Sequence, residues 1–208
     1  MSRRAVFLVN PKSGHGRVAR HDIVKRSQEI WKAAGYETAL IPIAGPGTAT
    51  EQTREITEHG CDVLFACGGD GTVHEVLQSL VVTRTSTALG IIPLGTGNVI
   101  ANNLGLPEAS PEAASIQLKF QPRRVAVGSM NTTSGSGQSS SRYFLAAAGL
   151  GLHAKMIHQA HSGLKGRSGM MAYYRSGFRL AFLEPRLAFE VDLTLPDGSV
   201  RTMTVYEL

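Results

Sequence analysis

Four short segments, each followed by a stretch with helical spacing, constrain the fold of the first 120 residues. Ala5–Val9, Asp62–Ala66 and Ala88–Pro93 are nearly unbroken apolar runs, and Thr38–Ile43 has strand character. An unbroken run is typical of a strand covered on both faces, because a strand with one solvated face alternates apolar and polar residues. The alternation of strands with helices therefore predicts an open parallel α/β sheet.

The helices expected between and after these strands share an apolar stripe at helical spacing. They are Val18–Ala33, Thr48–His59, Thr72–Val82, Asn98–Leu104 and Pro111–Phe120. Residues 1–121 are accordingly predicted to form one Rossmann-like α/β domain.

The pattern changes in residues 122–208. Arg124–Gly128 and Tyr143–Ala148 are predicted strands joined by a loop rich in glycine and serine at 131–142, and helical spacing returns over 166–183. Arg186–Leu208 is predicted to be a hairpin that turns at residues 196–199. We expect this second domain to be β-rich and incomplete, because so few strands do not form a stable sheet alone.

The sequence Gly68-Gly69-Asp70-Gly71-Thr72 lies between the third predicted strand and the third predicted helix. Three glycines in four residues allow positive φ angles and leave no Cβ to obstruct a ligand. The N–H groups at the start of a helix attract anions, and open α/β sheets bind ligands at the carboxyl ends of their strands. The segment therefore predicts a phosphate-binding loop; the alternative is a tight turn with Asp70 as helix N-cap.

Two similar polar loops follow the first and fourth predicted strands. They are Asn10-Pro11-Lys12-Ser13-Gly14 and Gly95-Thr96-Gly97-Asn98. Three small polar loops at neighbouring strand ends favour a nucleotide-binding site over three unrelated turns.

These loops resemble the motifs of the diacylglycerol kinase catalytic domain family, which is related to sphingosine and ceramide kinases. The matching sequences are NPKSG (10–14), GGDGTVHEV (68–76) and PLGTGN (93–98). RYFLAAAGLGLHA (142–154) and LKGRSGMMAYYRSGF (164–178) resemble, more loosely, the start of the family's β-rich lipid-binding domain. The resemblance implies an NAD kinase/phosphofructokinase-like fold for the first domain.

The resemblance also implies an enzyme that uses ATP and Mg²⁺ and transfers the γ-phosphoryl group to a lipid hydroxyl. Diacylglycerol is the first-choice acceptor, giving phosphatidic acid. Asp70 is the expected catalytic residue; it either accepts the proton of the lipid hydroxyl or orients a magnesium-bound phosphate. The expected nucleotide-binding residues are Asn10, Lys12, Ser13, Gly68, Gly69, Gly71, Thr72, Glu75, Gly95, Thr96 and Asn98. For Glu75 the alternative is a solvated helix residue, and metal ligands are not assigned.

The sequence departs from the family pattern at several positions. Val99, Ala126 and His153 stand where the family frequently has Asp, and its late Asp-Gly-Glu motif does not occur in these 208 residues. Two alternatives therefore stay open: a non-catalytic or truncated protein that binds a nucleotide or anionic lipid, and a kinase for a soluble acceptor such as NAD. We expect little turnover from these residues alone.

Charge is divided unevenly along the chain. Residues 1–112 carry 10 basic and 11 acidic side chains, whereas 113–208 carry 11 and 5. Arg167, Arg175 and Arg179 lie on a predicted amphipathic helix with aromatic neighbours, which favours contact with lipid at an anionic membrane surface. The alternative is a helix packed on the second domain with its arginines in water.

Other patterns exclude whole classes of protein. No apolar stretch approaches the ~18 residues that a membrane-spanning helix needs, and no secretory signal is present, so we expect a cytoplasmic protein, peripheral at the inner face of the membrane. Two cysteines are too few for a disulfide framework. His153, His158 and His161 lack the neighbouring ligands of a metal site. No nucleic-acid recognition motif occurs, and the oligomeric state stays open.

Overall fold

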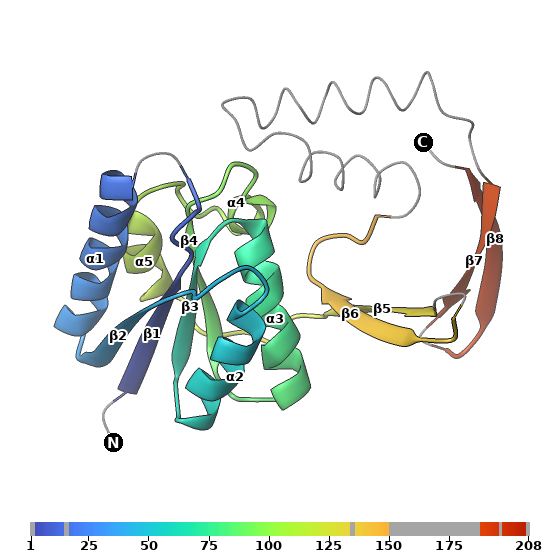
Figure 1. The fold of residues 1–208 in the computed structure, drawn as a ribbon, viewed down its shortest axis with the longest axis horizontal. Helices are drawn as coiled ribbons and strands as arrows, with labels where there is room; N and C mark the ends of the chain where they lie inside the picture. The colour runs from blue at the N-terminus through green and yellow to red at the C-terminus, as the bar shows by residue number, and fades with distance from the viewer. Residues whose placement is uncertain (1–2, 15–16, 134–135, 150–187, 196, 207–208) are drawn as a thin grey trace. The chain divides into compact units, whose positions relative to one another are not determined.

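The computed structural model describes residues 3–14, 17–133, 136–149, 188–195 and 197–206 (Figure 1). The chain divides into two compact units, Met1–Ala147 and Ala148–Leu208. This division does not decide the domain boundary predicted after residue 121, which stays a prediction.

A four-stranded parallel sheet forms the centre of the first unit, in the order β2-β1-β3-β4 (Figure 1). Its strands are β1 (Arg3–Val9), β2 (Tyr36–Pro42), β3 (Val63–Gly68) and β4 (Ala88–Pro93). The consecutive apolar side chains of β1 and β3 are buried, as expected for strands covered on both faces. The predicted open parallel α/β sheet is therefore confirmed.

Helices cover both faces of this sheet. They are α1 (Arg17–Ala33), α2 (Ala49–Glu58), α3 (Asp70–Thr83), α4 (Val99–Asn103) and α5 (Glu112–Gln117). Figure 1 shows α1 and α5 on one face, and α2 and α3 on the other. This follows from right-handed crossovers, because connections that run in opposite directions along a sheet place their helices on opposite faces.

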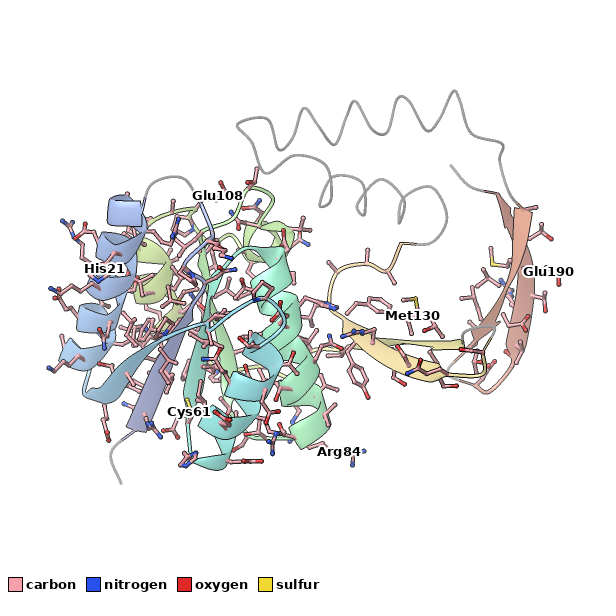
Figure 2. All side chains as sticks on the ribbon, viewed as in Figure 1. His21, Cys61, Arg84, Glu108, Met130 and Glu190 are labelled. Atoms are coloured by element: carbon pink, nitrogen blue, oxygen red, sulfur yellow. The ribbon has the colours of Figure 1, made fainter. Side chains whose placement is uncertain are left out.

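An aromatic cluster fixes the packing of α1 against the middle of the sheet. Phe7 and Phe65 are paired in register and stack with ring centroids 4.5 Å apart, while the Trp31 ring of α1 meets Phe65 edge-on at 4.8 Å. The next residue across the sheet is Gly90, where a Cβ would lie only 2.5 Å from the Phe65 ring. The glycine in the apolar run of β4 therefore makes room for Phe65. Side chains fill the layers between helices and sheet (Figure 2).

The outer edge of β4 is bonded to groups from other elements. The Gln117 side chain of α5 accepts a hydrogen bond from Ile91 N at 2.9 Å and donates one to Ile91 O at 2.8 Å. The next carbonyl along this edge, that of Pro93, accepts a hydrogen bond from Ala109 N at 2.9 Å. The outward main-chain groups of Ile91 and Pro93 are thereby satisfied without a further strand.

An antiparallel hairpin follows the α/β layers. Its strands are β5 (Gly128–Thr133) and β6 (Ser139–Phe144), with Gly137 at a φ of +82° in the turn. The sequence predicted two strands joined by a loop rich in glycine and serine, and this arrangement is present, but the predicted bounds are wrong. β5 begins where the predicted strand Arg124–Gly128 ends, β6 begins before the predicted strand Tyr143–Ala148, and the turn is shorter than the predicted loop at 131–142. The reason is that β5 and β6 consist mostly of polar and exposed residues, so no alternation of apolar residues marks them as strands.

One side chain of α3 joins this hairpin to the α/β layers. Gln78 Nε2 donates to Tyr143 O at 2.8 Å, and Tyr143 N donates to Gln78 Oε1 at 3.0 Å. Gln78 is 7% exposed, so both bonds are shielded from water. The amide of Gln78 therefore occupies the place of a neighbouring strand residue beside β6.

In the second unit the structure describes one antiparallel hairpin, β7 (Ala188–Thr194) and β8 (Val200–Tyr206). Its turn contains Gly198 at a φ of +81°, and the Asp197 carboxylate accepts a hydrogen bond from Ser199 N at 2.9 Å. The predicted C-terminal hairpin is confirmed, whereas the helical segment expected at 166–183 lies outside the described residues.

Among the helices that the structure describes, none has the length and apolar character to cross a membrane.

The double hydrogen bond of Gln78 predicts a local effect. Gln78→Ala removes both partners of Tyr143, so we expect its main-chain amide to exchange with deuterium about tenfold faster. Gln28→Ala on α1 is the matched control. Unchanged exchange at Tyr143 in the Gln78 variant would show that the hairpin is held by other contacts.

Candidate functional site

The strand order places a topological switch point between β1 and β3. From β1 the chain runs outward to the edge strand β2, and it then returns past β1 to form β3. The connection that follows β1 and the connection that follows β3 therefore pass over opposite faces of the sheet. Open α/β sheets bind ligands beyond the carboxyl ends of the strands at such a point. All three predicted loops follow strands at this end, after Val9, Gly68 and Pro93. In Figure 2, Cys61 and Arg84 mark the opposite end, where the chain enters β3 and β4.

A side-chain hydrogen bond joins the first two loops. Asn10 Nδ2 donates to Thr72 Oγ1 at 3.0 Å, although the two residues are 62 positions apart in the sequence. Asn10 Oδ1 accepts from Lys12 N at 2.9 Å, which fixes the orientation of the amide. Thr72 is 5% exposed at the start of α3. The structure thus brings together Asn10 and Thr72, as the nucleotide-site hypothesis requires.

The second and third loops meet through glycine backbones. A Cβ on Gly95 would lie 2.5 Å from Gly69 Cα, so no larger residue fits without separating the loops. Asn98 closes the third loop: its Oδ1 accepts from Gly95 N and its Nδ2 donates to Gly95 O, both at 2.9 Å. Asn98 is 3% exposed and has a φ of +45°, a left-handed conformation that asparagine tolerates better than most residues.

Asp70 is the first residue of α3, half-buried at the centre of these loops. The N-cap of α3 is Gly69, so the alternative in which Asp70 caps the helix is wrong. Across the described residues, no hydrogen bond or ion pair engages the Asp70 carboxylate, and a Cβ on Gly97 would lie 3.0 Å from its Oδ2. The carboxylate therefore lies beside the third loop with its acceptor capacity unused.

Glu75, one turn further along α3, contacts another helix. Its Oε2 accepts a hydrogen bond from Ala49 N at 3.1 Å, and its main-chain oxygen accepts one from Thr50 Oγ1 at 2.9 Å. The carboxylate therefore satisfies a free N–H group at the start of α2, where a negative charge is also favoured by the helix dipole. A contact of Glu75 with a nucleotide stays a prediction.

His74, the residue before Glu75 on α3, is shifted toward its neutral form. Partial burial, and secondarily the Arg142 guanidinium, lower the pKa of His74 below its ordinary value. Its deprotonated form is thus favoured beside Glu75.

The remaining predicted residues fall into two groups. Lys12 and Thr96 are exposed on their loops, and Ser13 N donates to Asn10 O at 3.3 Å. Arg167, Arg175 and Arg179, together with the three histidines, lie outside the described residues. Asn102 was not predicted from the sequence; its side chain donates a hydrogen bond to Gly97 O at 3.0 Å and supports the third loop. Its position inside a short helix gave no signal of this contact.

The described side chains at this edge of the sheet offer few ligands for a metal ion. The described part of the chain contains no group of three or more His, Cys, Asp or Glu side chains placed to bind a metal ion. Asp70 alone fits a Mg²⁺ ion that takes its other ligands from water and substrate phosphates, as this ion commonly does.

The fold and these loops define an open parallel α/β protein with three polar loops gathered at its switch point. The family model "Diacylglycerol kinase catalytic domain" matches residues 4–130. The chain belongs to this family.

Curated relatives extend the similarity beyond that range. The chain is 31% identical to the diacylglycerol kinase of Bacillus subtilis (strain 168), covering 98% of this chain and 64% of the relative. It is 33% identical to that of Staphylococcus saprophyticus, over 86% of this chain and 55% of the relative. The chain therefore spans between about half and two thirds of these relatives' lengths.

Solved structures support the fold. A crystal structure of a diacylglycerol kinase from Bacillus anthracis str. Sterne aligns with a TM-score of 0.62 at 23% identity, over 97% of this chain and 63% of that one. A second crystal structure from the same bacterium gives a TM-score of 0.66 at 25% identity, over 98% and 62%.

The glycine contact between the loops predicts a stability effect. Gly95→Ala forces the second and third loops apart, and we expect it to lower the free energy of unfolding by about 1–3 kcal/mol. Gly71→Ala is the matched control, because nothing lies within 4 Å of a Cβ at that position. Urea unfolding measures both; equal stability of the two variants would contradict the close approach of Gly69 and Gly95.

Proposed function

We propose that this chain provides the nucleotide-binding part of a lipid kinase. The enzyme transfers the γ-phosphoryl group of ATP to the hydroxyl of a lipid, with diacylglycerol as first-choice acceptor and phosphatidic acid as product. Family membership and relatives named diacylglycerol kinase support the class of reaction. The observation that carries the proposal is the meeting of three glycine-containing loops at the switch point, joined by the Asn10–Thr72 hydrogen bond.

The loops offer the groups that phosphates need. Phosphoryl transfer depends on positioning and on stabilisation of charge rather than on covalent chemistry by the protein. Glycine backbones allow close approach of a phosphate, and the start of the 14-residue helix α3 favours negative charge. The open space beside Gly71 leaves this helix end accessible.

Asp70 is the catalytic residue of the proposal. Its unused acceptor capacity suits a ligand of Mg²⁺ beside the phosphates, or a base for the lipid hydroxyl. When bound, Mg²⁺ neutralises charge on the phosphate oxygens. The two roles of Asp70 predict different responses to the concentration of Mg²⁺.

Asp70→Asn tests the proposal in the intact protein. Loss of the carboxylate should reduce phosphoryl transfer from ATP to diacylglycerol in mixed micelles by about 100-fold or more. A metal-orienting role also raises the Mg²⁺ concentration needed for half-maximal rate, whereas a base role lowers kcat at unchanged Mg²⁺ dependence.

Asp22→Asn is the control for this experiment. Asp22 is exposed on α1 and paired with Arg26, so its loss should leave the rate unchanged. An Asp70 variant that transfers phosphate at the wild-type rate would reject the assignment.

Membrane association belongs to the same proposal. The lipid acceptor resides in a bilayer, and the stretch from residue 113 to 183 holds nine Lys and Arg but no Asp or Glu. Each basic side chain near an anionic surface contributes ~1 kcal/mol of attraction.

Vesicle co-sedimentation measures this attraction. Changing Arg175 and Arg179 together to Gln should weaken binding to anionic vesicles by about 30-fold and reduce its salt dependence. Arg26→Gln on α1 is the control. Equal binding to neutral and anionic vesicles by the wild-type protein would reject the membrane role of this stretch.

A further inference from the structure

Arg20, near the start of α1, holds the loop that leaves β1. Its Nη1 donates a hydrogen bond to Pro11 O, and its Nη2 donates to Gly14 O at 3.2 Å. The planar guanidinium thus binds two carbonyl groups of the same loop at once, a geometry that a lysine cannot reproduce. The adjacent His21 is labelled on α1 in Figure 2.

The bond to Pro11 orients a whole peptide group. In a trans peptide the carbonyl oxygen and the next N–H point in opposite directions. The Pro11 carbonyl is held by Arg20, while the N–H of the same peptide group, that of Lys12, donates to Asn10 Oδ1 at 2.9 Å. The peptide is therefore fixed from both sides.

The same hydrogen bonds continue to α3. Because Asn10 Oδ1 is engaged by Lys12 N, its Nδ2 faces Thr72 and donates to Thr72 Oγ1 at 3.0 Å. The Thr72 oxygen accepts this bond, so its own hydroxyl hydrogen is left to donate. In the part of the chain that the structure describes, no acceptor takes that hydrogen. A hydroxyl so oriented suits an incoming phosphate oxygen.

One atom of the partly exposed Arg20 side chain argues against a purely stabilising role. Its Nε is buried and finds no hydrogen-bond partner among the described residues. An unsatisfied donor on a charged group costs stability. The favourable contacts of this side chain are those of its two Nη atoms, which hold the loop.

We propose that Arg20 is a positioning residue for the phosphates of ATP. It acts through the Pro11–Lys12 peptide and Asn10 to orient the Thr72 hydroxyl, and it does so by its paired hydrogen bonds rather than by its charge alone. This inference rests on the proposed nucleotide site and adds a residue to it.

Two substitutions in the intact protein separate geometry from charge. Arg20→Lys keeps the charge and loses one of the two carbonyl contacts, and Arg20→Gln removes the charge as well. We expect both to raise the Kd for ATP, measured by calorimetry, by about tenfold. KM for ATP should rise in parallel, with KM for diacylglycerol unchanged. Arg26→Lys and Arg26→Gln, at an exposed position on the same helix, should leave all of these constants unchanged.

A double-mutant cycle tests the route through Asn10. If Arg20 acts through Asn10, Arg20→Lys combined with Asn10→Ala weakens ATP binding no more than Asn10→Ala alone. Additive losses would overturn the proposed route.

The other outcomes are equally decisive. Wild-type affinity in Arg20→Lys would show that charge alone suffices and overturn the proposal. A lower unfolding temperature and lower kcat at unchanged KM for ATP would show a merely structural role and also overturn it. Failure of the wild-type protein to bind ATP would overturn the proposed function and this inference together, whereas wild-type binding with unaffected variants would overturn the inference alone.

Discussion

The parallel pairing of β1 with β3 is the constraint on which the site depends. Val9 pairs with Cys67, and this register places Asn10 beside the first turn of α3. A slip of one residue would move the loop about 3.3 Å along the strand and turn every side chain of β1 to the opposite face. The stacked rings of Phe7 and Phe65 oppose such a slip, so aromatic packing in the core also maintains the polar contacts at the strand ends.

Much of the α/β part is predictable from local patterns. Unbroken apolar runs located the strands, and Ala88–Pro93 has the same bounds in the structure as in the sequence analysis. The bounds predicted for β5 and β6 were displaced because the pairing of these strands uses main-chain groups while their side chains are mostly polar. The bonds of Gln78 to Tyr143 join positions 65 apart, and no local pattern contains such information.

The candidate site was predicted as a set of loops but not as a set of contacts. Glycine clustering and strand ends located Gly69, Asp70 and Gly95. The capping of α2 by Glu75 depends on how two helices pack. The hydrogen bonds of Arg20 to two carbonyl groups depend on the path of the loop after β1. In the sequence, Glu75 and Arg20 resemble ordinary charged residues of a helix, because the contacts that they make depend on their tertiary neighbours rather than on residue spacing.

The bonding along the outside of β4 has a consequence for association between chains. A strand at the edge of a sheet recruits strands from other molecules through free main-chain groups, and this is a common route to aggregation. At Ile91 both groups are already taken by the Gln117 amide, and at Pro93 the carbonyl is taken by Ala109 while proline has no N–H to offer. Another chain that approaches Ile91 must first displace α5, so the carboxyl half of this apolar strand is protected from intermolecular β-pairing by the Gln117 side chain, the Ala109 amide and the proline itself.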